Sequence, residues 1–321
     1  MVEVVIAGGG VSGLYFAYRL LSAVPDVKAT VVDPKPYHEF LIGVPMAFGG
    51  LVEFDQLKFP FSSMGRIRHV QSEVVEVAED GGFKLADGSV LRGDYNVLAV
   101  GSVRLGPETY FTVDGAKALY EKVKSAKAVR FIVDETYPVI GFQEIAIAVK
   151  SLWRSKEVSI HMVYVHPDYR WLFELHSHLF REFGIPITDE PPASYSPGEL
   201  LVTVPSTVLH PLARGLALGP LFETQYPNTY LIGESSLIKL RLPPLGWGAI
   251  WQASLLASAI ASEIRGGYAE VEADEWTALN DPDRFKQYFT LRMSKGIPLV
   301  ALRGLYELWR SKVVGTLSGS A

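Results

Sequence analysis

The sequence predicts an α/β fold made of two units, each a parallel sheet covered by helices, followed by a short C-terminal helical segment. Near the N-terminus, an apolar strand runs directly into a glycine-rich turn and an apolar helix. A similar succession of strand, turn and helix begins again near residue 127. The chain is 48% hydrophobic and 20% charged, a composition typical of packed domains rather than disorder. At 321 residues, it is too long for one ordinary core.

Composition excludes several classes of function. The net charge is −5, without the basic bias that nucleic-acid binding needs. The chain contains no cysteine, which excludes disulfides, thiolate metal sites and cysteine-based redox chemistry within it. No apolar run is long enough to cross a membrane and the first strand begins at residue 2, so we expect a cytoplasmic protein. Scarce Asn, Gln and Cys hint at a thermophile.

The N-terminal turn predicts a dinucleotide site. The apolar strand Val4–Ala7 is followed by three glycines, at positions 8, 10 and 13, with the spacing G-x-G-x-x-G. The first glycine allows a tight turn, the second lets the backbone approach a diphosphate, and the third lets helix and strand pack closely. The apolar helix Leu14–Leu21 would direct its free N–H groups and positive dipole end at the phosphates.

Asp33 completes this pattern. The second strand, Lys28–Val32, ends at this residue, at the distance from Gly13 where dinucleotide-binding folds place an acidic side chain. A carboxylate here accepts hydrogen bonds from a ribose 2′-OH and disfavours a 2′-phosphate. We therefore assign the following residues to the dinucleotide site: Gly8, Gly10, Val11, Ser12, Gly13, Asp33, Pro34 and Lys35.

The segment after this site extends it. Phe40–Gly50 is strongly apolar for a stretch broken by proline and glycine, so it covers either a flat cofactor ring or simply the core. Val70–Val77 and Gly82–Val90 are predicted to be the strands of a hairpin. Asp94–Val100 is predicted to be a buried strand whose end, at Gly101, touches the cofactor. We add four residues to the predicted site: Val75, Ala99, Gly101 and Ser102.

A second strand–turn–helix unit lacks a usable phosphate turn. Its strand is Val129–Val133 and its helix is Gly141–Ala148. In the turn between them, Asp134 and Glu135 would repel a diphosphate, and Pro138 has no N–H to donate. We predict a nucleotide-type domain that has lost its phosphate site, with NAD(P)H binding as the alternative.

Two later stretches return to the cofactor. The predicted strand Asn228–Ile232 ends at Gly233 and Glu234, and a Pro- and Gly-rich stretch precedes the apolar helix Ile250–Ile264. The first N–H groups of that helix could stabilise negative charge on a cofactor ring. The alternative is an ordinary turn before a core helix. The residues assigned here are Gly233, Glu234, Leu245 and Gly246.

The C-terminal stretch Phe285–Ala321 differs in charge from the rest of the chain. It carries six Lys or Arg residues and one Glu, which is a net charge of +5. Apolar and aromatic residues alternate with these cations, as in a helix that lies on anionic lipid. The pattern fits equally well a helix that packs on the protein body or on a dimer partner.

Four landmarks resemble, in order, those of flavoproteins in the pyridine nucleotide-disulfide oxidoreductase superfamily: 8–33, 94–101, 141–148 and 228–234. Residues 40–60 are similar to the corresponding stretch of sulfide:quinone oxidoreductases and flavocytochrome c sulfide dehydrogenases, whose sister group is the type II NADH dehydrogenases. The resemblance implies bound FAD, with Glu234 at the ribityl chain, and electron delivery to quinone. It also implies a discontinuous FAD-binding domain (1–105 and 223–275), an NAD(P)H-domain-like insert (106–222) and a membrane- or partner-facing segment (276–321).

Departures from these relatives leave the electron donor open. Sulfide oxidation in the relatives uses a pair of cysteines, which this chain lacks, and the turn at Asp134–Pro138 argues against NADH. We expect an FAD-dependent oxidoreductase that passes electrons from an unidentified donor toward quinone at the inner face of the cell membrane. The alternatives are an FAD-binding subunit with a protein redox partner and a non-enzymatic FAD-binding relative. No catalytic residue or metal ligand is assigned; His38 and Glu39 only lie near the expected flavin face.

Overall fold

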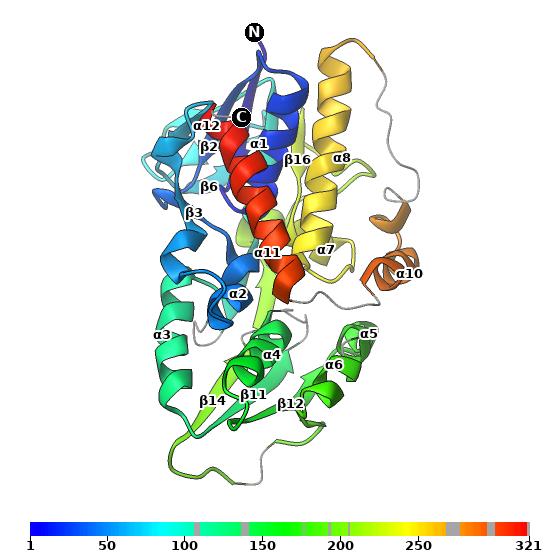
Figure 1. Ribbon diagram of the computed structural model, residues 1–321. Coiled ribbons are helices and arrows are strands. Elements are labelled where there is room, and N and C mark those ends of the chain that lie inside the picture. The colour runs from blue at the N-terminus through cyan, green and yellow to red at the C-terminus, as the bar shows by residue number, and fades with distance from the viewer. Residues whose placement is uncertain are drawn as a thin grey trace.

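The structure is a computed structural model that describes residues 1–105, 110–135, 141–175, 177–191, 194–204, 206–267, 277–293 and 299–319. Two parallel sheets form an upper and a lower lobe in Figure 1, and the chain crosses between them. This is the α/β fold with two Rossmann-like sheets that the sequence predicts.

The upper sheet brings together distant parts of the chain. Its five strands are parallel and lie in the order β16-β9-β1-β2-β5. The inner strand β9, between β16 and β1, is buried along its whole length, as expected where helices or loops cover both faces of a parallel sheet. The strands are β1 (Glu3–Ala7), β2 (Lys28–Val32), β5 (Ile67–Val70), β9 (Tyr95–Leu98) and β16 (Thr229–Leu231).

The predicted hairpin is only partly correct. β6 (Val74–Val77), β7 (Phe83–Leu85) and β8 (Val90–Leu91) form a three-stranded antiparallel sheet. The single strand predicted for Val70–Val77 is divided, because the Ser72 N–H donates to the Val70 carbonyl in a tight turn. Val70 therefore ends β5 in the parallel sheet instead of opening the hairpin.

Two long helices cover one face of the upper sheet. α1 (Val11–Ala23) and α8 (Gly246–Ile264) pack side by side, with α7 (Glu234–Lys239) directly after β16. Both helices begin earlier than the sequence predicts, because the glycines before each apolar run already adopt helical geometry. This places the N-termini of α1 and α8 at the same edge of the sheet, where strands β1 and β9 end.

The lower sheet is formed by residues 128–204, which lie within the insert expected at 106–222. Its four parallel strands lie in the order β13-β12-β11-β14. They are β11 (Ala128–Glu135), β12 (Glu157–Val165), β13 (Ile187–Thr188) and β14 (Glu199–Val204). Its helices are α3 (Val113–Ser125), α4 (Phe142–Leu152), α5 (Trp171–Leu175) and α6 (Ser177–Glu182). The predicted phosphate turn lies only partly within the described residues: Asp134 and Glu135 end β11, and 136–140 are outside them.

Short elements connect the lobes. β10 (Ser102–Leu105) pairs antiparallel with β15 (Ser206–Leu209) where the chain enters and leaves the insert. The apolar segment after Asp33 folds as β3 (Tyr37–Glu39), α2 (Val44–Phe48) and β4 (Lys58–Pro60). Single 3₁₀ turns lie at Leu41–Gly43, Phe54–Leu57, Phe61–Ser63, Pro167–Tyr169 and Pro211–Ala213.

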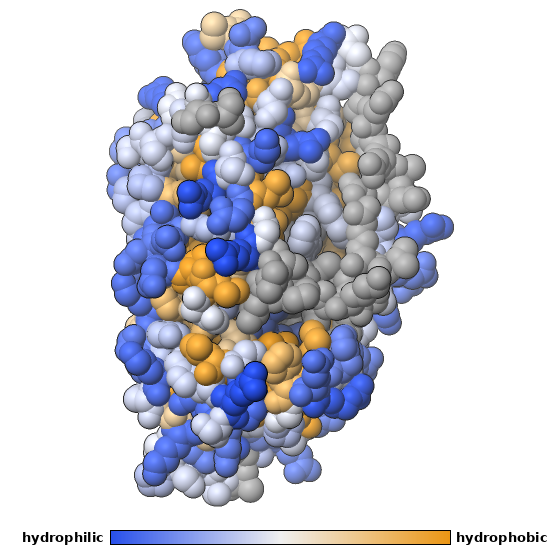
Figure 2. Space-filling view, viewed as in Figure 1, coloured by the Kyte–Doolittle hydropathy of each residue, from blue (hydrophilic) through white to orange (hydrophobic). Residues whose placement is uncertain are grey.

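The C-terminal segment packs on the protein body. It contains α10 (Pro282–Met293), α11 (Leu299–Leu308), a π-helical turn (Trp309–Val314) and α12 (Gly315–Ser318). Its apolar face is buried against the upper lobe, and its exposed side carries cations, within a mixed polar and apolar surface (Figure 2). The buried side chains are Leu302, Tyr306, Trp309, Val313 and Leu317. No described helix is long and apolar enough to cross a membrane.

Candidate functional site

A cavity of about 480 Å³ lies between the two lobes, at the edge of the upper sheet where its strands end. A second cavity of about 300 Å³ continues it along the glycine-rich turn, and the two share lining residues such as Gly8, Asp33 and Lys35. The larger cavity is closed on the C-terminal side by Phe289 of α10 and Leu302 of α11. An elongated ligand could therefore extend from the turn to the insert.

The glycine-rich turn has the geometry that the spacing predicts. Gly8 has a φ of +105°, and a Cβ there would lie 2.4 Å from the Ala99 carbonyl oxygen. A Cβ at Gly13 would lie 2.0 Å from the Gly8 carbonyl oxygen, so helix and strand could not approach as they do. A Cβ at Gly10 would meet nothing within 4 Å, because this residue faces the open cavity.

Asp33 and His38 hold this turn from two sides. The Asp33 carboxylate accepts from the Gly9 N–H at 2.8 Å and from the Lys35 N–H at 2.9 Å. The His38 Nδ1 lies 2.9 Å from the Gly9 carbonyl oxygen, so Nδ1–H is the donor. Burial is the main reason that the pKa of His38 is lowered to about 4, and this keeps the ring neutral.

Two helices point their N-termini at the cavity. Val11 and Ser12 open α1, and Gly246 and Trp247 open α8; all four line the cavity. The first N–H groups of a helix have no partner within the helix, and its dipole adds positive potential there. This is the arrangement that binds a diphosphate at one helix and a developing negative charge at another.

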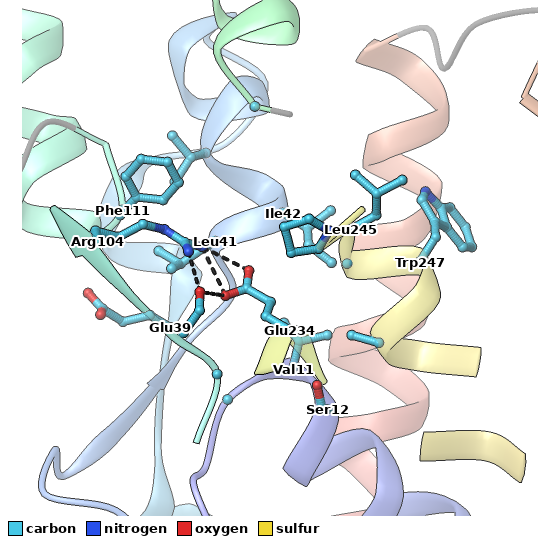
Figure 3. Close-up of a pocket in the computed structure, with 18 of the residues that line it drawn as sticks. Val11, Ser12, Glu39, Leu41, Ile42, Arg104, Phe111, Glu234, Leu245 and Trp247 are labelled. Carbon is cyan, nitrogen blue, oxygen red and sulfur yellow. Dashed lines mark hydrogen bonds and ion pairs between the residues drawn. The ribbon is translucent and has the colours of Figure 1, made fainter. Parts of the chain in front are cut away.

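An ion pair between β10 and α7 forms part of the cavity wall. Arg104 on β10 donates to Glu234 at 2.8 and 3.0 Å, and the Ser102 hydroxyl donates to the same carboxylate at 2.5 Å (Figure 3). Arg104 also lies over the Phe111 ring, 4.6 Å from its centroid. Glu234 is the residue expected at the ribityl chain, and Arg104 is the group that balances its charge.

The cavity also has apolar walls, and one of the carboxyl groups in its lining is Glu144. Ile42, Leu245 and Trp247 line one side of it (Figure 3). Glu144, in the first turn of α4, lies deep in the protein with part of its side chain facing the cavity, and its Oε2 has no hydrogen-bond partner among the described residues. Burial raises the pKa of Glu144 to about 7.

Most of the predicted site residues line these two cavities. They are Gly8, Gly10, Val11, Ser12, Asp33, Pro34, Lys35, Ala99, Gly101, Ser102, Glu234, Leu245 and Gly246. Gly13 instead packs behind the turn, and Gly233 packs on Ser12, whose Oγ would lie 2.6 Å from a Cβ at that position. Val75 is 46% exposed, and its neighbour Val74 lines the smaller cavity, because alternate side chains of a strand face opposite sides.

Sequence reasoning did not find several lining residues. Arg104 is two residues after Ser102 on one strand, so alternation could have indicated that both side chains share a face. Glu144 was inside a predicted helix, and only tertiary packing shows that it is half-buried in the cavity wall. His38 was expected near the flavin face, yet it does not line either cavity and lies under the C-terminal segment. Among the described residues, no three His, Asp or Glu side chains form a group that could hold a metal.

Comparison with known proteins agrees with this fold. No family model matches the sequence. A stretch of 117 residues is 28% identical to the sulfide-quinone reductase of Aquifex aeolicus, covering 35% of this chain and 26% of that protein. The match therefore spans about a quarter of the relative's length.

Solved structures extend the similarity over most of the chain. The sulfide:quinone oxidoreductase of Aquifex aeolicus superimposes with a TM-score of 0.62 at 17% identity, over 83% of this chain and 78% of that one. An NAD-dependent persulfide reductase from A. fulgidus gives 0.62 at 22% identity, over 81% and 59%. Putidaredoxin reductase, in its covalent complex with putidaredoxin, gives 0.61 at 18%, over 85% and 77%.

These similarities agree with the fold described above. The chain is a structural relative of the pyridine nucleotide-disulfide oxidoreductases and has the fold of FAD- and NAD(P)-dependent oxidoreductases. It is related to flavin oxidoreductases only distantly, and it has no cysteine.

Proposed function

We propose that the protein is an FAD-dependent oxidoreductase that passes electrons from an unidentified donor toward quinone at a membrane surface. The observation that carries this proposal is the continuous cavity from the glycine-rich turn to the N-terminus of α8. Gly10 leaves room for a diphosphate where any side chain would fill it. The donors and acceptors along the cavity therefore fit FAD.

Each part of the cavity has a distinct role in this proposal. The N–H groups of Val11 and Ser12 would hold the diphosphate, Asp33 the adenosine ribose and Glu234 the ribityl hydroxyls. The N-terminus of α8 would stabilise negative charge at the ring end. FAD supplies the two-electron chemistry when it is bound.

Glu144 is the side chain best placed to exchange a proton with a substrate at the ring end. It lines the cavity, and its pKa of about 7 lets it both give and take a proton near neutral pH. A side chain that exchanges protons suits a quinone, which takes up protons on reduction, better than NAD(P)H.

Absorbance and redox measurements test the central claim. Purified protein should be yellow and should release FAD on heating, and the apoprotein should regain flavin absorbance when FAD is added. Anaerobic stopped-flow bleaching with candidate donors, followed by reoxidation with a soluble quinone, would identify both substrates. Protein that stays colourless with added FAD contradicts the proposal, whereas bound FAD that no natural donor reduces indicates a non-enzymatic relative.

Membrane attachment is a separate part of the proposal. The apolar face of α11 to α12 is covered by the protein body, so attachment would depend on the exposed cations Arg303, Arg310 and Lys312. Substituting all three by Ser should abolish flotation with anionic vesicles. The matched control replaces three exposed lysines of the insert, Lys122, Lys124 and Lys127, by Ser.

Equal loss of flotation in both variants would mean that only net charge matters. If the wild-type protein itself does not float, the cationic side of the C-terminal segment becomes the candidate docking surface for an acidic redox protein.

A further inference from the structure

His38 connects the C-terminal segment to the glycine-rich turn. Its ring is 1% exposed and lies 5.3 Å from the Trp309 ring, centroid to centroid, at an interplanar angle of 27°. Trp309 is itself 1% exposed and also stacks on Phe40 at 5.0 Å and on Tyr15 of α1 at 6.1 Å. The indole therefore fills an aromatic box whose walls include His38 and the first helix.

The His38 hydrogen bond determines where the next backbone N–H points. The Gly9–Gly10 peptide is trans, so its carbonyl and its N–H point in opposite directions. The carbonyl oxygen of Gly9 is bound by His38, which lies outside the cavity lining. The N–H of Gly10 is consequently directed away from His38, toward the cavity that Gly10 lines. If the carbonyl were free, this peptide could rotate and turn the N–H away.

We propose that His38 is a positioning residue that aims the Gly10 N–H at the cofactor diphosphate, and that Trp309 keeps it in place. The C-terminal segment then contributes to the FAD site in two ways, through Leu302 in the cavity lining and through Trp309 behind the turn. Because coupling between two binding events is reciprocal, a docked segment strengthens FAD binding and bound FAD strengthens docking by the same factor. This inference rests on the proposed binding of FAD.

Paired variants separate the ring from the hydrogen bond. His38→Phe keeps an aromatic ring and removes the donor, whereas His38→Asn keeps a donor at the place of Nδ1 and removes the ring. Trp309→Ala empties the box, and Trp309→Phe keeps a ring in it. Trp153→Phe, at an aromatic contact with Tyr120 in the insert, is the control.

FAD affinity of the apoprotein is measured by flavin fluorescence below the unfolding temperature of every variant. His38→Phe and Trp309→Ala should each weaken binding about tenfold, the effect of losing one well-placed hydrogen bond. His38→Asn, Trp309→Phe and Trp153→Phe should stay within about threefold of the wild type. A purely structural role would lower the stability of both His38 variants without separating their affinities.

Tryptic cleavage at Arg303, Arg310 and Lys312 of the wild-type protein measures docking directly. Saturating FAD should slow this cleavage by about the factor by which Trp309→Ala weakens FAD binding. Unchanged cleavage, or unchanged affinity in Trp309→Ala, overturns the coupling even if His38→Phe does not fold. A wild-type protein that binds no FAD overturns the proposed function and this inference together.

Discussion

The guanidinium of Arg104 donates to both carboxylate oxygens of Glu234, at 2.8 and 3.0 Å, across the wall of the cavity. Arg104 comes from the strand that enters the insert, and Glu234 from the helix that follows β16. The pair therefore ties the connection between the lobes to the upper lobe. Without Arg104, the Glu234 carboxylate would face the cavity without a compensating charge.

Replacing Arg104 tests the importance of this charge balance. Arg104→Ala should weaken FAD binding by roughly 10- to 100-fold, the effect of losing a charge-assisted, two-point contact. The FAD affinity of Arg104→Lys should lie between those of the wild type and of Arg104→Ala, because an ammonium cannot form both bonds in the same geometry. The measurement is flavin fluorescence titration of the apoprotein.

The chain contains a matched control for Arg104. Arg130 forms a similar ion pair with Glu199, at 2.7 and 2.8 Å, inside the insert and away from the cavity. Arg130→Ala should leave FAD affinity within about threefold of the wild type. Equal losses in both variants would mean that Arg104 acts only through general stability.

Two glycines of the same turn should respond in opposite ways to alanine. Gly13→Ala places a Cβ 2.0 Å from a backbone oxygen and should lower the free energy of unfolding by about 3 kcal/mol. Gly10→Ala meets nothing within 4 Å, so stability should change by less than about 1 kcal/mol. FAD affinity of Gly10→Ala should nevertheless fall by at least about tenfold, because the methyl group enters the diphosphate space.

Urea unfolding and FAD titration of both variants check this pair. Normal FAD binding by Gly10→Ala would show that the diphosphate does not lie against this turn.

Glu144 should make stability depend on pH. Its pKa is raised from 4.5 to about 7, so between these values the folded state holds a proton that the unfolded state has lost. Wild-type stability should therefore fall, relative to Glu144→Gln, as the pH rises from about 5 to 8, by up to about 3 kcal/mol. Urea unfolding at several pH values measures this difference.

The surface variant Glu182→Gln is the control for Glu144 and should follow the wild type at every pH. A gap between wild type and Glu144→Gln that does not grow with pH would mean that the carboxyl is solvated.

The buried His38 ring should make the protein lose stability as the pH falls, whereas Glu144 makes it lose stability as the pH rises. Its pKa is lowered from 6.5 to about 4, mainly by burial, with Lys35 adding to the shift. The unfolded state binds a proton first as the pH falls, so stability should be lost between about pH 6.5 and 4 by up to about 3 kcal/mol. His38→Phe should lack this loss, which chemical denaturation at pH 7, 5 and 4 would measure.

A wild-type protein as sensitive to acid as His38→Phe would show that the ring is not held neutral by the fold.

Local patterns in the sequence were sufficient for the glycine-rich turn. The spacing of Gly8, Gly10 and Gly13 and the position of Asp33 are set by steric and hydrogen-bonding needs of one turn, so they can be recognised without neighbours. The hairpin prediction failed at Val70 because strand propensity does not say which neighbour a strand pairs with. The alternation of apolar residues in 299–318 predicted an amphipathic helix, but the pattern is the same whether the apolar face meets lipid or protein.

By itself, the sequence determined that this is a two-lobed α/β protein with a glycine-rich turn of G-x-G-x-x-G spacing, no cysteine and a cationic C-terminal segment. Only the tertiary structure decided that Arg104 pairs with Glu234, that Glu144 is half-buried in the cavity wall, and that Trp309 stacks on His38 behind the glycine-rich turn. The physical reason is that these pairings join side chains far apart in the chain. Their contact depends on how the lobes and the last helix pack, which no local pattern contains.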